Sequence, residues 1–147
     1  MMIKGALAAA VLALASPVVA HEDVTPPMSA EAVAEIRPLV DGFFGTLQGG
    51  DTAKAYADLF ADTLMAAKAL EVQNLVAQTS FIFQTYGPII DWTLARSDCF
   101  TPTLCRAAYQ VNTANGPVIV LLTLYRRQAG WIPAHILIGD STQNLFD

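Results

Sequence analysis

Two side chains of this 147-residue sequence could act as a general base. His135 is one, because an imidazole changes its protonation state near neutral pH. Asp91 is the other, since a carboxylate can accept a proton from a carbon acid. Both have simpler explanations: alternation of apolar residues places His135 on the outer face of a strand, and Asp91 lies near Arg96 and Asp98, a pattern typical of a solvated edge. The catalytic residues therefore stay open, and we expect binding rather than covalent chemistry.

Four aromatic side chains with polar ends could line a small-molecule pocket, namely Tyr56, Tyr86, Trp92 and Tyr109. Such side chains offer a ligand an apolar body and a hydrogen-bonding end. Packing in a hydrophobic core explains the same four residues equally well. The sequence lacks a phosphate-binding glycine loop, a dinucleotide fingerprint and a serine-nucleophile elbow, so we expect no cofactor. The expected ligand is a small apolar molecule.

The two cysteines, Cys99 and Cys105, are separated by five residues that include Pro102, where a turn is expected. In an oxidising compartment such a pair usually forms a structural disulfide. A redox pair and half of a metal site are the alternatives, but the spacing differs from C-x-x-C and no second ligand pair is nearby. His21 could bind copper at a newly formed N-terminus, although it lacks a clear histidine partner. We therefore predict a disulfide and no metal site.

The first twenty residues have the order of a cleavable signal peptide. Lys4 precedes an apolar run over residues 5–15, and small residues end at Ala20. A retained membrane anchor is the alternative, but the run is shorter than the roughly 20 residues that span a bilayer. Cleavage would leave a periplasmic or secreted chain with no membrane span. Loss of Lys4 changes the formal net charge from −5 to −6, and scattered basic residues argue against nucleic-acid binding.

The rest of the chain predicts an α+β domain in which helices precede strands. Residues 21–28 form an extended leader, and residues 29–147 form the domain. Apolar residues recur at helical spacing over residues 30–47, 52–60 and about 66–86, and the period then changes to two. Strands are predicted over residues 89–97, 104–113, 117–127 and 131–139. Three N-terminal helices should therefore pack on a curved antiparallel sheet of about four strands.

Turn residues predict how the last three strands pair. A turn at Asn115-Gly116 would pair Ala114 with Pro117, and a loop over residues 128–130 would pair His135 with Thr123. Isoleucines and alanine at 132, 134, 136 and 138 then face the core. The opposite face carries a second apolar set, for which a homodimer interface is the simplest explanation. Its residues are Ile119, Leu121, Tyr125, Trp131, His135 and Leu137.

The order of elements resembles the cone-shaped fold of the nuclear transport factor 2-like superfamily. The segments that carry the resemblance are Leu47–Asp51 with Ala55-Tyr56 and Leu59–Asp62, and Gly130–Pro133 at the last strand. The superfamily includes ketosteroid isomerases, dehydratases, polyketide cyclases and binding or assembly domains, so the resemblance implies a fold without selecting a function.

Residue comparison argues against the isomerase chemistry of that superfamily. The isomerases use a tyrosine on the first helix, and the matching Phe43 has no donor. Their basic aspartate follows the second helix, whereas here no carboxylate lies between Asp62 and Glu71. The resemblance is therefore to small exported bacterial members of unknown function. We expect such a domain to bind a small apolar ligand or a protein partner, for example an envelope protein. An isomerase- or dehydratase-like enzyme and an envelope-complex assembly domain stay open as alternatives.

Overall fold

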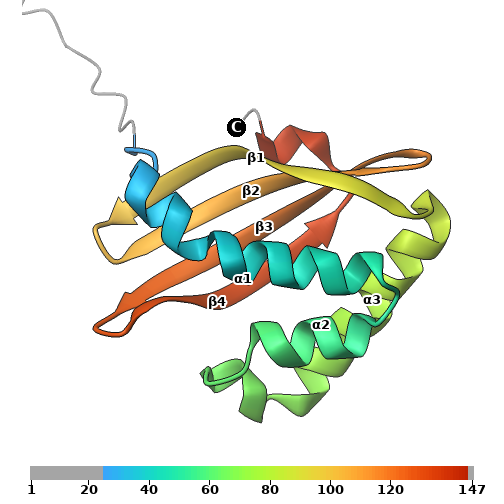
Figure 1. Ribbon diagram of the computed structural model, residues 1–147, viewed down its shortest axis with the longest axis horizontal. Helices are drawn as coiled ribbons and strands as arrows, with labels where there is room; N and C mark the ends of the chain where they lie inside the picture. The colour runs from blue at the N-terminus through green and yellow to red at the C-terminus, as the bar shows by residue number, and fades with distance from the viewer. Residues whose placement is uncertain (1–24, 146–147) are drawn as a thin grey trace, which may run out of the picture.

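Helices come first and strands second in the computed structural model, which describes residues 25–145. The predicted signal peptide and the start of the predicted leader lie outside the described residues. The elements are α1 (Ala30–Gln48), α2 (Thr52–Leu59), η1 (Leu64–Ala67), α3 (Ala69–Tyr86), β1 (Ile89–Thr101), β2 (Leu104–Thr113), β3 (Gly116–Arg127), β4 (Gly130–Gly139) and η2 (Thr142–Leu145). The four strands form one antiparallel sheet in the order β1-β2-β3-β4 (Figure 1). The predicted α+β class is confirmed.

The first helix lies across one face of the sheet, α2 packs next to it, and α3 packs against α2 (Figure 1). Ser29 caps α1 by accepting a hydrogen bond from the Ala32 amide at 3.1 Å. Pro38 lies inside α1, which continues on both sides of it. The third helix begins at Ala69, later than predicted, because residues 64–67 form a separate 3-10 turn. It ends at Gly87, whose φ of 89° suits glycine.

The hairpin between β2 and β3 turns one residue earlier than predicted, which shifts the pairing of the two strands by two residues. Thr113 pairs with Gly116, so the turn residues are Ala114 and Asn115. The end of α3 fixes this turn: the Asn115 amide donates to the Tyr86 carbonyl at 3.0 Å, and the Ala114 amide donates to a neighbouring carbonyl. A shift of two residues keeps every side chain on its predicted face, since strand alternation has a period of two.

The hairpin between β3 and β4 has a shorter loop than predicted, and this changes the face on which the first residues of β4 lie. Arg127 pairs with Gly130, so the loop has two residues rather than three. A bulge at residues 133–135 then restores the predicted pairing of His135 with Thr123. Pro133 has no amide donor, which is the usual reason for a ladder to break at such a point.

As a result, the predicted faces of residues 131–133 are wrong, and Ala134, which was predicted to face the core, lies in the bulge and is exposed. Trp131 pairs with Arg126 and packs against the main core, and Pro133 is buried opposite Leu124. Ile132 instead pairs with Tyr125 of the outer face. Residues after the bulge keep their predicted faces, because the extra residue corrects the shortened loop.

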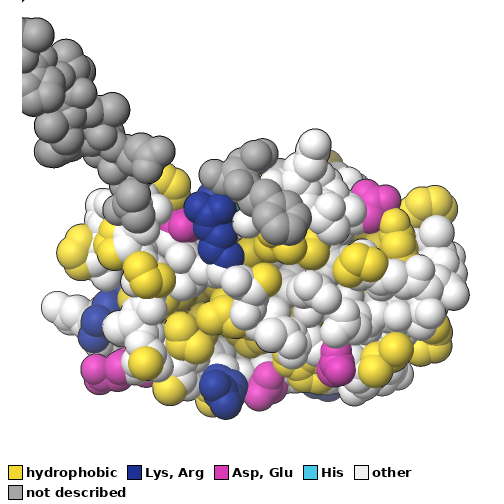
Figure 2. All heavy atoms as spheres, turned by 90° about the horizontal axis from the view of Figure 1, so that it is seen from above, with side chains coloured by type: hydrophobic (Ala, Val, Ile, Leu, Met, Phe, Trp, Pro, Cys, Tyr) yellow, Lys and Arg dark blue, Asp and Glu magenta, His cyan; other side chains and the backbone are white. Residues whose placement is uncertain are grey.

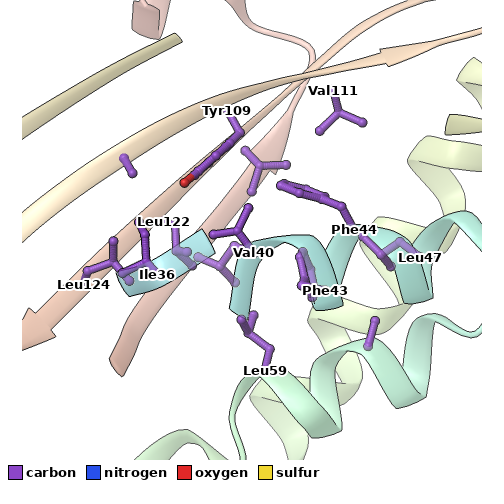
Figure 3. Packing of buried hydrophobic residues seen from close by; sticks show 14 of the residues in the cluster. Ile36, Val40, Phe43, Phe44, Leu47, Leu59, Tyr109, Val111, Leu122 and Leu124 are labelled. Carbon is purple, nitrogen blue, oxygen red and sulfur yellow. The ribbon is translucent and has the colours of Figure 1, made fainter. Parts of the chain in front are cut away.

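The main core lies between α1, α2 and the inner face of the sheet (Figure 3). Ile36, Val40 and Phe44 of α1 face the side chains of β2 and β3, among them Val111 and Leu122. A second, smaller cluster lies on the outer face, where Leu145 of η2 packs against its buried residues, Ala108, Ile119 and Leu121. The chain's own C-terminal turn therefore covers part of the apolar outer face.

The end of the sheet that carries the cysteines is fastened in three ways. Cys99 and Cys105 are paired across β1 and β2 and form a disulfide with an S–S distance of 2.00 Å, as predicted. The Cys99 amide donates to the Pro26 carbonyl at 2.7 Å, and the Met28 amide donates to Ser97 Oγ at 2.9 Å. Residues 25–28 therefore form an arm held against β1. Within residues 25–145, no helix combines the length and apolar character needed to cross a membrane.

Candidate functional site

A hollow of about 250 Å³ lies between α1 and the first two strands. It is lined by Val33, Arg37, Val40, Asp41, Trp92, Thr93, Leu94 and Tyr109. Figure 2 shows hydrophobic side chains in the hollowed middle of the molecule and charged side chains along the lower margin of the view. We call this hollow the α1–β1 pocket.

Regular helix and strand spacing brings the lining residues together. Position 37 lies four residues after 33, and positions 40 and 41 lie three and four residues after 37, so the four positions share one side of α1. Trp92 and Leu94 alternate onto the inner face of β1, and Leu94 is paired with Tyr109 of β2. The pocket therefore rests on two rigid elements rather than on loops.

The inner wall of the α1–β1 pocket is aromatic. The ring of Phe44, which is 1 % exposed, lies 5.5 Å from the Trp92 ring and 5.7 Å from the Tyr109 ring. Figure 3 shows the Tyr109 side chain extending from the sheet toward α1, near Phe44. These contacts fix both rings, because each ring loses apolar contact if it leaves Phe44.

The polar residues that line the pocket are Arg37, Asp41, Thr93 and Tyr109, and two of them carry opposite charges. Trp92 Nε1 donates to Asp41 Oδ1 at 2.9 Å, which holds that carboxylate at the rim. Burial raises the pKa of Tyr109 to about 12, with the Asp41 charge adding to the rise and Arg37 opposing it. At neutral pH the Tyr109 hydroxyl is therefore protonated and able to donate a hydrogen bond.

Neither Arg37 nor Asp41 belongs to an ion pair within residues 25–145. The ion pairs there join Lys54 to Asp58, Lys68 to Glu71, and both Arg96 and Arg106 to Asp98. The guanidinium of Arg37 and the second oxygen of Asp41 are thus free to contact a ligand, and both residues are exposed at the pocket rim.

Two of the four predicted ligand-binding aromatics meet in this pocket, Trp92 and Tyr109. Tyr56 is fully buried in the core, where its hydroxyl lies 2.6 Å from Thr79 Oγ1. Tyr86 lies away from the pocket and donates to Asp140 Oδ2 at 2.8 Å.

Sequence reasoning missed Arg37 and Asp41. Their separation of four residues, beside the apolar stripe of α1, was the available signal. That signal is weak, because charges beside a buried stripe usually face solvent.

The two predicted bases lie outside the α1–β1 pocket. His135 lines a different hollow, of about 200 Å³, beside η1 and α3 with Met65, Glu71 and other residues. Asp91 is exposed on the outer face of β1 and accepts a hydrogen bond from Asn112 Nδ2 at 2.6 Å. Neither residue is therefore near the Tyr109 hydroxyl.

The predicted interface residues separate into three groups. Ile119 and Leu121 are on the outer face, but they are only 3 % and 8 % exposed beneath the contact with Leu145. Tyr125, His135 and Leu137 are exposed. Trp131 packs against the inner core, and its ring lies 5.9 Å from the guanidinium carbon of Arg126.

The α1–β1 pocket is distinguished by its chemistry rather than its size. A larger hollow of about 510 Å³ lies where α1, α3 and the start of β1 meet. Its lining residues, among them Gln48, Ser80 and Phe83, include no ionisable side chain. Small-molecule sites usually combine apolar walls with a few convergent polar groups, as the smaller hollow does.

Comparison with known proteins finds no family, no curated protein and no solved structure that matches this chain. Among residues 25–145, no three histidine, cysteine or acidic side chains lie close enough together to hold a metal ion. The fold and the pocket define an α+β domain with a polar-rimmed hollow between its first helix and its sheet.

Proposed function

We propose that this chain is a binding domain that takes one small molecule with an apolar body into the α1–β1 pocket and performs no covalent chemistry. The observation that carries the proposal is the convergence of Arg37, Asp41 and the protonated Tyr109 hydroxyl above apolar walls. These groups would orient a ligand, while Trp92 and Leu94 would contact its body.

The size of the pocket favours a ligand smaller than a steroid. Its volume of about 250 Å³ is just below the ~300–1,000 Å³ that is typical of sites for drug-sized molecules. The Trp92 and Tyr109 rings that line the pocket are packed against Phe44, and Arg37 is exposed at the rim, so we expect a longer ligand to extend outward past Arg37. We therefore expect a ligand of about the size of one aromatic ring with a short polar group.

The enzymatic alternative, an isomerase- or dehydratase-like activity, needs a base beside a hydrogen-bond donor. His135 and Asp91, the two bases named from sequence, do not line the α1–β1 pocket. Asp41 is the carboxylate that does, and one of its oxygens is already engaged by Trp92. The binding role uses Arg37, Asp41 and the Tyr109 hydroxyl together, so we prefer it.

We further propose that the protein is exported and dimerises through the exposed part of the outer face. The disulfide and the signal-like residues 1–20 support export, because disulfides persist in oxidising compartments. Tyr125 and Leu137, which are 45 % and 55 % exposed, support the interface. An envelope protein docking on this same face is the alternative partner.

A tryptophan that fills the α1–β1 pocket should abolish ligand binding. Val33→Trp adds bulk at the pocket wall, whereas Ala34→Trp adds the same side chain at an exposed position of the same helix. Native mass spectrometry of protein purified from the periplasm should show an extra mass on wild type and on Ala34→Trp, and none on Val33→Trp. An adduct retained by Val33→Trp would contradict the proposed site. The intact mass also reports whether residues 1–20 have been removed.

A charge on the outer face should separate the proposed dimer. Leu137→Glu is expected to give a folded monomer in sedimentation velocity, because a carboxylate would lose its hydration in the interface. Phe81→Glu is the matched control, since Phe81 is 69 % exposed on α3 and does not belong to the sheet. A wild-type protein that sediments as a monomer, or a Leu137→Glu variant that still dimerises, would rule out this interface.

A further inference from the structure

The rim of the α1–β1 pocket presents a cation and an anion that do not neutralise each other. Arg37 and Asp41 lie one turn apart on the same side of α1, yet they do not pair. An arginine that precedes an acidic residue by four positions has the less favourable orientation for a helical ion pair. Trp92 also holds Asp41 from the strand side, through the bond of its Nε1 to Oδ1.

The rim therefore has hydrogen-bond donors on some residues and a hydrogen-bond acceptor on another. The Arg37 guanidinium and the Tyr109 hydroxyl are donors, and they suit the oxygens of a carboxylate. The second carboxylate oxygen of Asp41 is an acceptor, and it suits an ammonium group. A ligand with only one charge would satisfy one side of this rim and bring a like charge toward the other.

The apolar part of the pocket limits what the two charges can be attached to. Val33, Val40 and Leu94 provide aliphatic walls, and the Trp92 ring lies beside them. A volume of about 250 Å³ accommodates a single side-chain-sized group, and the Trp92 and Tyr109 rings that line it are held in place by packing against Phe44. The ligand should thus carry both charges next to one small apolar group.

We infer that the ligand of the α1–β1 pocket is a small zwitterion, an α-amino acid with an apolar or aromatic side chain. Its carboxylate would contact Arg37 and Tyr109, its ammonium group would contact Asp41, and its side chain would lie against Trp92 and Leu94. This inference rests on the proposed function, because it names the ligand class of the same pocket.

Matched probes can test the two charges one at a time by isothermal titration calorimetry at pH 7. L-phenylalanine carries both charges, 3-phenylpropionate lacks the ammonium group, and 2-phenylethylamine lacks the carboxylate. L-leucine, 4-methylpentanoate and 3-methylbutylamine form the corresponding aliphatic set. We expect the amino acid of at least one set to bind about tenfold or more tightly than both of its partners, since each loses one charge-assisted contact.

Substitutions in the rim should change the preference between the probes in opposite directions. Arg37→Gln should reduce the affinity for the amino acid about tenfold or more and leave that for the amine unchanged or higher. Asp41→Asn should likewise reduce the affinity for the amino acid and leave that for the carboxylate unchanged or higher. Glu35→Gln, an exposed carboxylate of α1 outside the pocket lining, should change none of the affinities.

The possible outcomes distinguish the inference of a zwitterionic ligand from the proposed function of the pocket in binding a small molecule. A carboxylate or amine that binds as tightly as its amino acid in both sets overturns the zwitterion and leaves a small-molecule pocket, provided that Val33→Trp abolishes the binding. Binding that persists in Val33→Trp overturns both, because the probe then occupies another site. If no probe binds and wild type carries no extra mass from the periplasm, both are likewise overturned.

Discussion

Two tyrosines of this protein share an apolar environment and a raised pKa, yet they lie in regions of different kinds. Burial raises the pKa of Tyr56 to about 12, and burial raises the pKa of Tyr109 to the same value. The Tyr56 hydroxyl lies 2.6 Å from Thr79 Oγ1, and both residues are fully buried. Tyr109 instead lines the α1–β1 pocket beside Arg37 and Asp41.

The difference shows that the role of a buried hydroxyl can be inferred from the groups that lie next to it. A hydroxyl in an apolar setting costs free energy unless it has a partner, so the Tyr56–Thr79 pair completes a closed core. The Tyr109 hydroxyl borders a hollow with two unpaired charges, so its partner can be a ligand. The two tyrosines are buried to nearly the same extent. They differ in what their hydroxyl groups contact, which is a threonine side chain for Tyr56 and a hollow for Tyr109.

Raising the pH tests the raised pKa that the two tyrosines share. We expect it to have the largest effect on the free energy of unfolding among the changes considered. The folded pKa of each is about 12, above the ordinary value of 10, so folding favours the protonated form. This stabilisation is complete below pH 10 and is lost as the pH rises from 10 to about 12. Urea unfolding at a series of pH values should show the free energy of unfolding falling across that range.

Single substitutions assign the fall in stability to its sources. Tyr56→Phe and Tyr109→Phe should each make the dependence on pH shallower, because each removes one titrating group. Tyr125→Phe is a control, since Tyr125 is 45 % exposed on the outer face. If both core variants lost stability as steeply as wild type between pH 10 and 12, the raised pKa values would not be the cause.

Sequence reasoning anticipated features that depend on local pattern. The order of helices and strands follows from the change of period, and the Cys99–Cys105 disulfide follows from spacing and compartment. The faces of β2 and β3 were also predicted, although the turn was misplaced. An error of two residues preserves alternation, and this is why the core face survived it.

Features set by tertiary contacts were not predictable in the same way. Carbonyls at the end of α3, including that of Tyr86, fix the β2–β3 turn, and they lie far away in sequence. Trp131 was assigned to the outer face because the bulge at Pro133 gives no signal in an alternating pattern. Arg37 and Asp41 look like ordinary surface charges until β1 brings Trp92 beside them. The site therefore depends on the packing of β1 against α1, which the sequence pattern does not specify.

Removing one tyrosine hydroxyl at a time should change the free energy of unfolding by different amounts in the two regions. Both changes should be smaller than the effect of high pH. Tyr56→Phe leaves Thr79 Oγ1 buried without its partner and should cost about 1–3 kcal/mol in the free energy of unfolding at pH 7. Tyr109→Phe should change stability by less than about 0.5 kcal/mol, because a hydroxyl that borders a hollow loses little when it is removed. Urea unfolding of both variants measures the difference.

The same two variants should show the reverse order in ligand binding. Tyr109→Phe removes a donor from the α1–β1 pocket and should weaken binding of the amino-acid probe severalfold, whereas Tyr56→Phe should leave it unchanged once the variant is folded. Thr79→Val combined with Tyr56→Phe should recover part of the lost stability, because the unpartnered hydroxyl is then absent. Equal losses of stability in the two single variants would mean that the Tyr109 hydroxyl belongs to the core as the Tyr56 hydroxyl does, and the pocket would lose one of the three groups on which its assignment depends.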